Sequence, residues 1–285
     1  MKKGWISPPL NPMTETVSST CTAVVLAADR GRGDPVAALT GAPCKALAPV
    51  GGTPMLLRVL DALEDARSVA RAVICGPPPE IVEGNEALQR RLSAGRLSWT
   101  PAQSTPSLSV LHALAPLLNE APVLLTTADH ALLTPSIVDY FWRQASRLPA
   151  QIVAGVASCA IVTQAFPQVR RTPLRFRDGA VCGCNLFAFK SPDSLLAARF
   201  WRRVEQDRKR PLRIARALGW MTVLRYLSGR LSLNQALGAL SKRIGVRAAT
   251  ISLPFPEAAI DVDTPQDWHL VEHLLTRRTG SSTDA

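Results

Sequence analysis

Residues 23–28 form a short apolar segment, which we predict to be a strand. A loop rich in glycine and arginine follows directly, up to residue 33. Backbone N–H groups and guanidinium groups at the end of a strand attract anions. One lysine, Lys45, follows between two apolar segments, and the Gly51-Gly52 turn comes before a predicted helix over residues 54–63. This combination indicates phosphate chemistry.

The elements that must position these residues alternate between strand-like and helix-like patterns. This alternation predicts parallel βαβ units, with a mostly parallel sheet and helices on both faces. Ligands of such sheets bind beyond the carboxyl ends of the strands. Further strands are predicted over residues 70–75, 123–126, 151–163, 183–190 and 248–253. Further helices are predicted over residues 80–93, 108–118 and 134–147, and a loop over residues 99–107.

Composition limits the class of protein. Hydrophobic residues make up 47 % of the 285 residues and charged residues 19 %, which excludes a disordered chain. No apolar run approaches the roughly 20 residues that span a bilayer. The first 20 residues lack the apolar core of a signal peptide, and we expect them to be a flexible leader, as we expect residues 277–285 to be a flexible tail. The six cysteines include no Cys-x-x-Cys pair, so we expect reduced thiols and a cytoplasmic protein.

The positive charge is concentrated in one segment. Residues 199–247 contain 13 Lys and Arg against two acids, an excess of 13 − 2 = 11 that equals the net charge of the whole chain, +11. The segment from about 195 to 247 is predicted to be helical and to interrupt the α/β pattern as a basic insert. One interpretation is a solvated helical face. The other is attraction to anions, with peripheral contact to an anionic membrane at its inner face.

Several motifs occur in a recognisable order. Leu26-Ala27-Ala28 ends the first predicted strand, and Gly51-Gly52-Thr53-Pro54-Met55-Leu56 follows Lys45. Further along are Thr127-Ala128-Asp129, Gly183-Cys184-Asn185 and a segment running from Asp261 to Asp267. The ordered set resembles the MobA-like and sugar-phosphate nucleotidyltransferase family. The resemblance implies one Rossmann-like domain of the GT-A type over residues 21–276, which carries the basic insert.

The resemblance also implies an activity and a site. An NMP group, with CMP or GMP as the expected choices, would pass from a nucleoside triphosphate to a phosphorylated small molecule or lipid precursor, with release of pyrophosphate. Lys45 would bridge phosphate oxygens, Arg30 or Arg32 would assist it, and Asn185 would face the acceptor. Asp129, Asp263 and Asp261 would bind Mg²⁺. The nucleotide would contact residues in two loops, namely Leu26, Ala27, Ala28, Asp29, Gly31, Gly33, Gln103, Ser104, Ser107 and Ser109.

The sequence departs from the family pattern in its phosphate loop. Asp29 stands where the family usually has glycine, and Gly33 where it has arginine. Two alternatives therefore stay open, namely a GT-A-type nucleotide-sugar glycosyltransferase and an inactive nucleotide- or membrane-binding relative. We expect no nucleic-acid partner, since no recognised DNA- or RNA-binding fold is present. Neither the acceptor nor the oligomeric state follows from the sequence.

Overall fold

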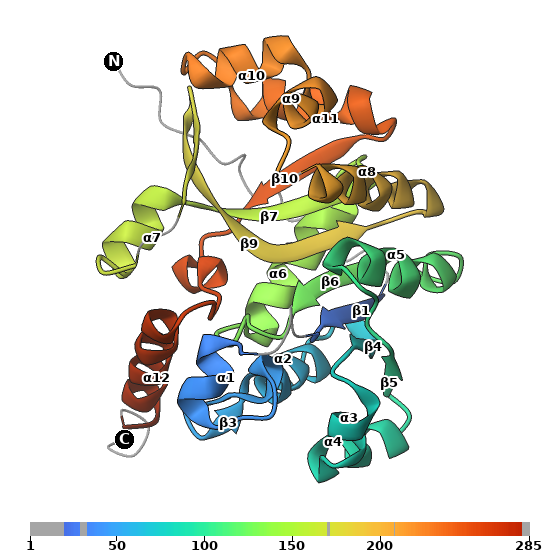
Figure 1. Ribbon diagram of the computed structural model, residues 1–285, viewed down its shortest axis with the longest axis vertical. Helices are drawn as coiled ribbons and strands as arrows, with labels where there is room; N and C mark the ends of the chain where they lie inside the picture. Colours follow the sequence, from blue (N-terminus) through green and yellow to red (C-terminus); the bar gives the residue numbers. More distant parts are fainter. Residues whose placement is uncertain (1–19, 29–32, 170–171, 208, 281–285) are drawn as a thin grey trace, which may run out of the picture.

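The computed structural model describes residues 20–28, 33–169, 172–207 and 209–280 (Figure 1). Its main sheet has eight strands in the order β10-β7-β9-β6-β1-β4-β5, with β8 paired to β9. The strands are β1 (Cys21–Leu26), β4 (Val69–Cys75), β5 (Leu97–Thr100), β6 (Val123–Thr127), β7 (Ile152–Ser158), β8 (Leu174–Phe176), β9 (Gly179–Phe189) and β10 (Ala248–Ser252). A separate two-stranded sheet joins β2 (Pro49–Val50) to β3 (Thr53–Pro54).

The sheet is mixed and mostly parallel, as the sequence predicted. β1 pairs in parallel with β4 and β6, β4 with β5, and β7 with β10. β9 lies between β6 and β7 and is antiparallel to both. Because β1, β4, β5 and β6 run in the same direction, the loops after them meet at one edge of the sheet.

Helices cover both faces of the sheet, and β1 shows why. Ala23 and Val25 point into one buried cluster, with side chains such as Leu56 and Phe141, while Val24 points into a second cluster on the other face. Alternate residues of a strand face opposite sides, so an uninterrupted apolar strand requires cover on both. The helices of the α/β part are α1 (Pro35–Thr40), α2 (Met55–Glu64), α3 (Pro79–Glu83), α4 (Glu86–Ser93), α5 (Pro106–Leu117), α6 (Pro135–Arg147), α7 (Cys159–Ala165) and α12 (Pro265–Gly280).

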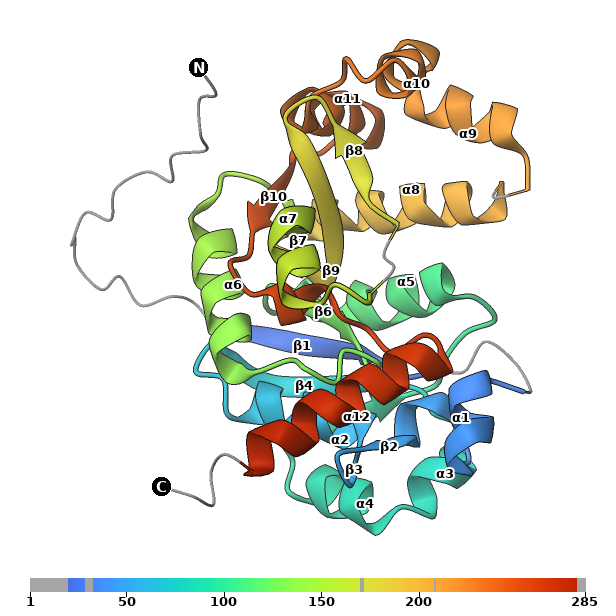
Figure 2. The same cartoon turned by 90° about the vertical axis from the view of Figure 1, so that its left-hand side faces the viewer.

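Four further helices form most of the basic insert, namely α8 (Leu195–Gln206), α9 (Pro211–Leu218), α10 (Trp220–Leu227) and α11 (Leu233–Ile244). In both views, α9, α10 and α11 gather at the end of the molecule opposite α4 (Figures 1 and 2). In Figure 2 α12 crosses in front of the sheet near β1 and β4. None of the helices in the described ranges is long and apolar enough to cross a bilayer.

Three predicted elements differ from the structure. The predicted strand over residues 151–163 ends at Ser158, whose side chain accepts from the backbone N–H of Ala160 at 3.3 Å and starts α7. The stabilisation of the helix start by this N-cap outweighs the strand preference of the β-branched residues that follow. The predicted helix over residues 80–93 is two helices, because Asn85 caps the second through the N–H of Leu88.

The predicted loop over residues 99–107 was also wrong at both ends. β5 continues through Thr100 as an edge strand that pairs with β4, and α5 already begins at Pro106. The strand is short and only partly apolar, so its pattern alone is weak. Thr105 supplies the cap of α5 by accepting from the N–H of Leu108 at 3.3 Å.

The Gly51-Gly52 turn allows a matched test of packing. Both glycines have positive φ, +56° and +74°. A Cβ on Gly51 would lie 2.6 Å from Arg58 Nη2 and 3.0 Å from Leu275 Cβ, whereas a Cβ on Gly52 would meet nothing within 4 Å. We expect Gly52→Ala to lower the free energy of unfolding by about 1 kcal/mol through backbone strain alone. Gly51→Ala should lower the free energy of unfolding by roughly 1–3 kcal/mol more than Gly52→Ala does, because its Cβ overpacks the site. Urea unfolding of both variants would measure the difference. Equal losses would contradict this packing argument.

Candidate active site

Three charged side chains from distant parts of the chain meet at the carboxyl edge of the sheet. Lys45 begins a short 3₁₀ helix (η1, Lys45–Leu47), Asp129 follows β6, and Asp263 precedes α12. Lys45 Nζ lies 2.7 Å from Asp129 Oδ2 and 2.7 Å from Asp263 Oδ1. The three residues are the predicted phosphate-bridging lysine and two of the three predicted metal ligands. The fold therefore brings them together, although their roles in catalysis remain predictions.

Neighbouring groups fix the orientation of Asp129. The Thr127 hydroxyl donates to Asp129 Oδ1 at 2.6 Å, and the backbone carbonyl of Asp129 accepts from the N–H of Val262 at 3.0 Å. The second bond ties the loop after β6 to the loop that carries Asp263. The side chain of Asp129 is 18 % exposed, so it is held in place and still open to a ligand.

The start of α12 positions Asp263 in the same way. Asp267 accepts from the N–H and the hydroxyl of Thr264, at 3.0 and 2.7 Å, and its own N–H donates back to Thr264 Oγ1 at 3.2 Å. Thr264, with Pro265 next to it and Asp267 three residues on, is a helix-start pattern that can be read in the sequence itself. The N–H of Asp263 also donates to Asp267, at 3.3 Å. These bonds of the Asp267 carboxylate therefore fix the backbone at Asp263, and they do not involve the Asp263 carboxylate.

Asn185 and Asp261 form a second contact of the cluster. Asn185 Nδ2, on β9, donates to Asp261 Oδ2 at 3.1 Å. Asp261 and Asp263 thus have different neighbours, one the predicted acceptor-binding amide and the other the lysine. The antiparallel direction of β9 is what carries Asn185 to this side of the sheet.

Two carboxylate oxygens that converge on one ammonium form a donor set suited to a hard cation. Asp129 and Asp263 could hold Mg²⁺ through one oxygen each, as this ion commonly binds with one or two carboxylates plus phosphate oxygens and water. Within the described residues, no group of three or more His, Cys, Asp and Glu side chains is arranged to hold a metal ion. Most ligands of such an ion would therefore come from the substrate and water.

The residues predicted to bind the nucleotide lie in different surroundings. Asp29 and Gly31 lie outside the described residues, as do Arg30 and Arg32, which were predicted to assist Lys45. Leu26 and Ala27 are integrated into the sheet, since the Leu26 carbonyl accepts from Ala128 and the Ala27 N–H donates to Cys75, each at 2.9 Å. Ala28 and Gly33 line a pocket of about 830 Å³.

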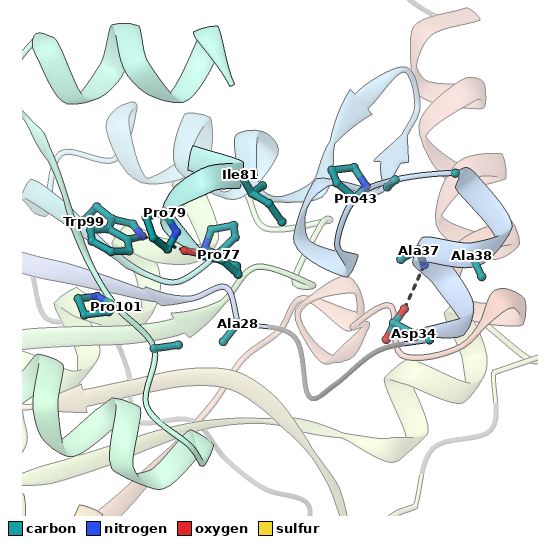
Figure 3. A pocket seen from close by; sticks show the side chains of 15 residues that line it. Ala28, Asp34, Ala37, Ala38, Pro43, Pro77, Pro79, Ile81, Trp99 and Pro101 are labelled. Atoms are coloured by element: carbon teal, nitrogen blue, oxygen red, sulfur yellow. Dashed lines mark hydrogen bonds between the residues drawn. The ribbon is translucent and has the colours of Figure 1, made fainter. Parts of the chain in front are cut away.

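That pocket has mostly apolar walls (Figure 3). Pro77, Pro79 and Trp99 form one side, and α1 forms the other, where the Asp34 carboxylate accepts from the N–H groups of Val36 and Ala37. The indole N–H of Trp99 donates to the Pro77 carbonyl at 3.0 Å, which fixes the ring. The sequence did not point to this wall, because neither Trp99 nor the two prolines belong to the motifs that carry the family resemblance.

The other predicted residues lie in the loop before α5 and in the first turn of α5 itself. Gln103 and Ser104 are exposed, whereas Ser107 and Ser109 are buried. Ser109 Oγ accepts from the N–H of Gln103 at 2.8 Å, and Ser107 Oγ donates to the carboxylate of Glu205 on α8. The Ser109 hydroxyl thus holds the loop against α5, and the Ser107 hydroxyl joins α5 to α8 of the basic insert.

The surroundings of Lys45 determine its protonation. Burial is the largest influence and lowers the pKa of Lys45, but the charges and hydrogen bonds of Asp129 and Asp263 together outweigh it, so the pKa is raised above 10.5. The side chain is therefore an ammonium at neutral pH. It is an electrostatic group rather than a base that accepts protons near pH 7.

This shift predicts a dependence of stability on alkaline pH. Because the pKa is higher in the folded state, the protonated lysine stabilises the fold; that contribution is complete below the unfolded pKa of about 10.4 and is lost as the pH rises through the folded pKa. We therefore expect wild type to lose unfolding free energy relative to Lys45→Met as the pH rises above about 10. Urea titrations of both proteins over this range would measure it, and curves that stay parallel would contradict it.

A mostly parallel sheet with a lysine and carboxylates at its carboxyl edge is an architecture of Rossmann-like nucleotidyltransferases. The chain belongs to the MobA-like NTP transferase domain family, which it matches over residues 23–182. It is also similar to a hypothetical transferase from Thermus thermophilus, with 31 % identity and a TM-score of 0.72 over 87 % of this chain and 99 % of that one. A comparison with curated protein sequences found no match.

More distant structures share the fold. A 4-diphosphocytidyl-2C-methyl-D-erythritol synthase from Anaerococcus prevotii has 12 % identity and a TM-score of 0.55, over 91 % of this chain and 97 % of that one. The CMP:2-keto-3-deoxy-manno-octonic acid synthetase complexed with CTP has 13 % identity and a TM-score of 0.53, over 91 % and 100 % of the two chains. These likenesses confirm the predicted fold class.

Proposed function

We propose that this protein transfers an NMP group from a nucleoside triphosphate to a phosphorylated small molecule or lipid precursor. The observation that carries the proposal is the convergence of Lys45, Asp129 and Asp263 at the carboxyl edge of the sheet. An oxygen of the acceptor phosphate forms a bond to the α-phosphorus, the bond from that phosphorus to the bridging oxygen of the β-phosphate breaks, and pyrophosphate leaves. An ionised acceptor phosphate is already a nucleophile, so the protein need not supply a base.

The residues of the cluster would act by position and charge. The ammonium of Lys45, kept protonated, would stabilise the negative charge that develops on the oxygens of the α-phosphate. Asp129 and Asp263 would hold Mg²⁺, which supplies positive charge to offset that of the triphosphate. Asn185 would orient the acceptor, and its bond to Asp261 would set the direction of the amide.

The pocket beside Ala28 and Gly33 would take the nucleotide base. Its apolar wall of proline and tryptophan suits a flat ring, and it adjoins the end of β1, where we expect the phosphates to bind. We favour CTP or GTP. CTP is bound in one structural neighbour, the CMP:2-keto-3-deoxy-manno-octonic acid synthetase, and GTP follows from the resemblance to MobA-like enzymes.

Two measurements test the proposal. Thermal unfolding with CTP, GTP, UTP or ATP and Mg²⁺ should show a shift of several degrees for the true donor, since a ligand at about 100 times its Kd adds roughly 2.7 kcal/mol. With that nucleotide, a panel of sugar phosphates and other phosphomonoesters should yield pyrophosphate. Release of a nucleoside diphosphate from a nucleotide sugar would instead indicate a glycosyltransferase. Binding without product across the panel would contradict catalysis by this site.

A further inference from the structure

The large exposed apolar side chains are concentrated in the basic insert. In the described part of the chain nine such side chains are exposed, and seven of them lie between residues 196 and 227. The most exposed is Leu227, at 76 %, and Trp220 is 56 % exposed. We call the surface of α9 and α10 the α9–α10 face; its apolar members are Leu212, Trp220, Met221, Leu224 and Leu227.

Helix α10 has two distinct sides. Trp220, Leu224 and Leu227 are spaced four and then three residues apart, so they share one side, which faces solvent. On the other side the ring of Tyr226 packs edge-on against Phe176 of β8, with ring centres 5.8 Å apart. The Tyr226 hydroxyl also accepts from a backbone N–H of β8 at 3.4 Å. The helix is therefore anchored to the β8–β9 hairpin and presents its apolar side outward.

Arginines surround these apolar side chains. Arg216, Arg225 and Arg230 are exposed, and none forms an ion pair with a carboxylate among the described residues. Arg177, Arg225 and Arg230 line a surface hollow of about 530 Å³ together with Met221 and Leu224. Guanidinium groups and apolar carbons thus share one concave surface. The whole segment from 199 to 247 carries an excess of 11 positive charges.

We propose that the α9–α10 face docks the protein on the surface of an anionic lipid bilayer. Tryptophan and leucine on one side of a helix, bordered by arginine, match the interfacial zone of a membrane, where apolar groups reach the acyl chains and cations meet lipid phosphates. A nucleic acid offers the charge but no apolar layer for Leu224 and Leu227. A second copy of the same face would bring two strongly positive surfaces together. The bilayer complements both the charge and the apolar side.

The test is vesicle co-sedimentation of the full chain, without nucleotide, so that its outcome is independent of the proposed catalysis. We expect binding to vesicles of phosphatidylcholine and phosphatidylglycerol at low salt, weaker binding at high salt, and little binding to phosphatidylcholine alone. The triple variant R216Q/R225Q/R230Q should lose roughly 100-fold in partition coefficient, since each basic residue near such a surface contributes about fivefold. The control R67Q/R90Q/R96Q removes the same charge from exposed sites elsewhere and should bind as wild type does.

A second variant separates insertion from adsorption. L224S/L227S keeps every charge, and we expect it to bind at least tenfold more weakly, with an unchanged circular dichroism spectrum showing that the helices persist. Absence of wild-type binding to anionic vesicles at low salt would overturn the proposal. So would equal binding by the two triple variants, binding to single-stranded RNA but not vesicles, or a dimer in solution that L224S/L227S abolishes.

Discussion

Replacing Lys45 with alanine will lower turnover by roughly 100- to 1,000-fold and leave the fold intact, the usual effect of removing one preorganised charge from an active site. Lys45 is the cation held between Asp129 and Asp263, at 2.7 Å from each. Without it, two carboxylates face the phosphates with no ammonium between them. Both carboxylates are partly exposed, at 18 % and 49 %, so solvent reduces the cost of leaving them together.

The measurement is pyrophosphate release under saturating donor nucleotide. Lys242→Ala is the control, because it removes a lysine from an exposed position on α11. We expect Lys45→Ala to bind Mn²⁺, followed by electron paramagnetic resonance as a substitute for Mg²⁺, at least as tightly as wild type, since the competing ammonium is gone. Near-normal turnover in Lys45→Ala would remove this residue from the mechanism. Turnover lost together with the circular dichroism signal would assign it a structural role instead.

Replacing Asp129 with asparagine will lower turnover by a similar factor for a different reason. Asparagine keeps the shape, and the Thr127 hydroxyl can still donate to the side-chain oxygen. The negative charge is lost, however, so one of two carboxylate ligands for a divalent cation disappears. The pKa of Lys45 falls as well, because the charge of Asp129 is the largest influence that raises it.

Metal affinity distinguishes the two variants. Asp129→Asn should bind Mn²⁺ at least tenfold more weakly than wild type, whereas Lys45→Ala should not. Asp193→Asn, at an exposed position before α8, is the matched control for loss of one carboxylate. If Asp129→Asn retained wild-type turnover and metal affinity, the cluster would be an ion-pair network without a catalytic role.

The sequence by itself determined the fold class and the residues of the charged cluster. The apolar strand at residues 23–28, the strand before Asp129 and the helix start at Thr264 are local patterns, since each depends on burial or capping within a few residues. The order of the motifs added the family. A parallel α/β sheet then requires the loops after its strands to meet at one edge, and for this reason Asp129 could be expected beside the loop that follows residue 28. The place of Lys45 in the site came from the family resemblance.

Tertiary structure alone decided how those residues contact one another. The bonds of Lys45 to Asp129 and Asp263 span 84 and 218 positions of the chain, and no local pattern specifies such pairs. The partner of Ser107 on α8 is equally distant, at 98 positions. Strand β5 also depends on its pairing with β4 rather than on its own residues. The outward side of α10 appears only once Tyr226 is packed on Phe176. Composition shows that the insert is basic, but packing decides which of its side chains remain exposed to solvent.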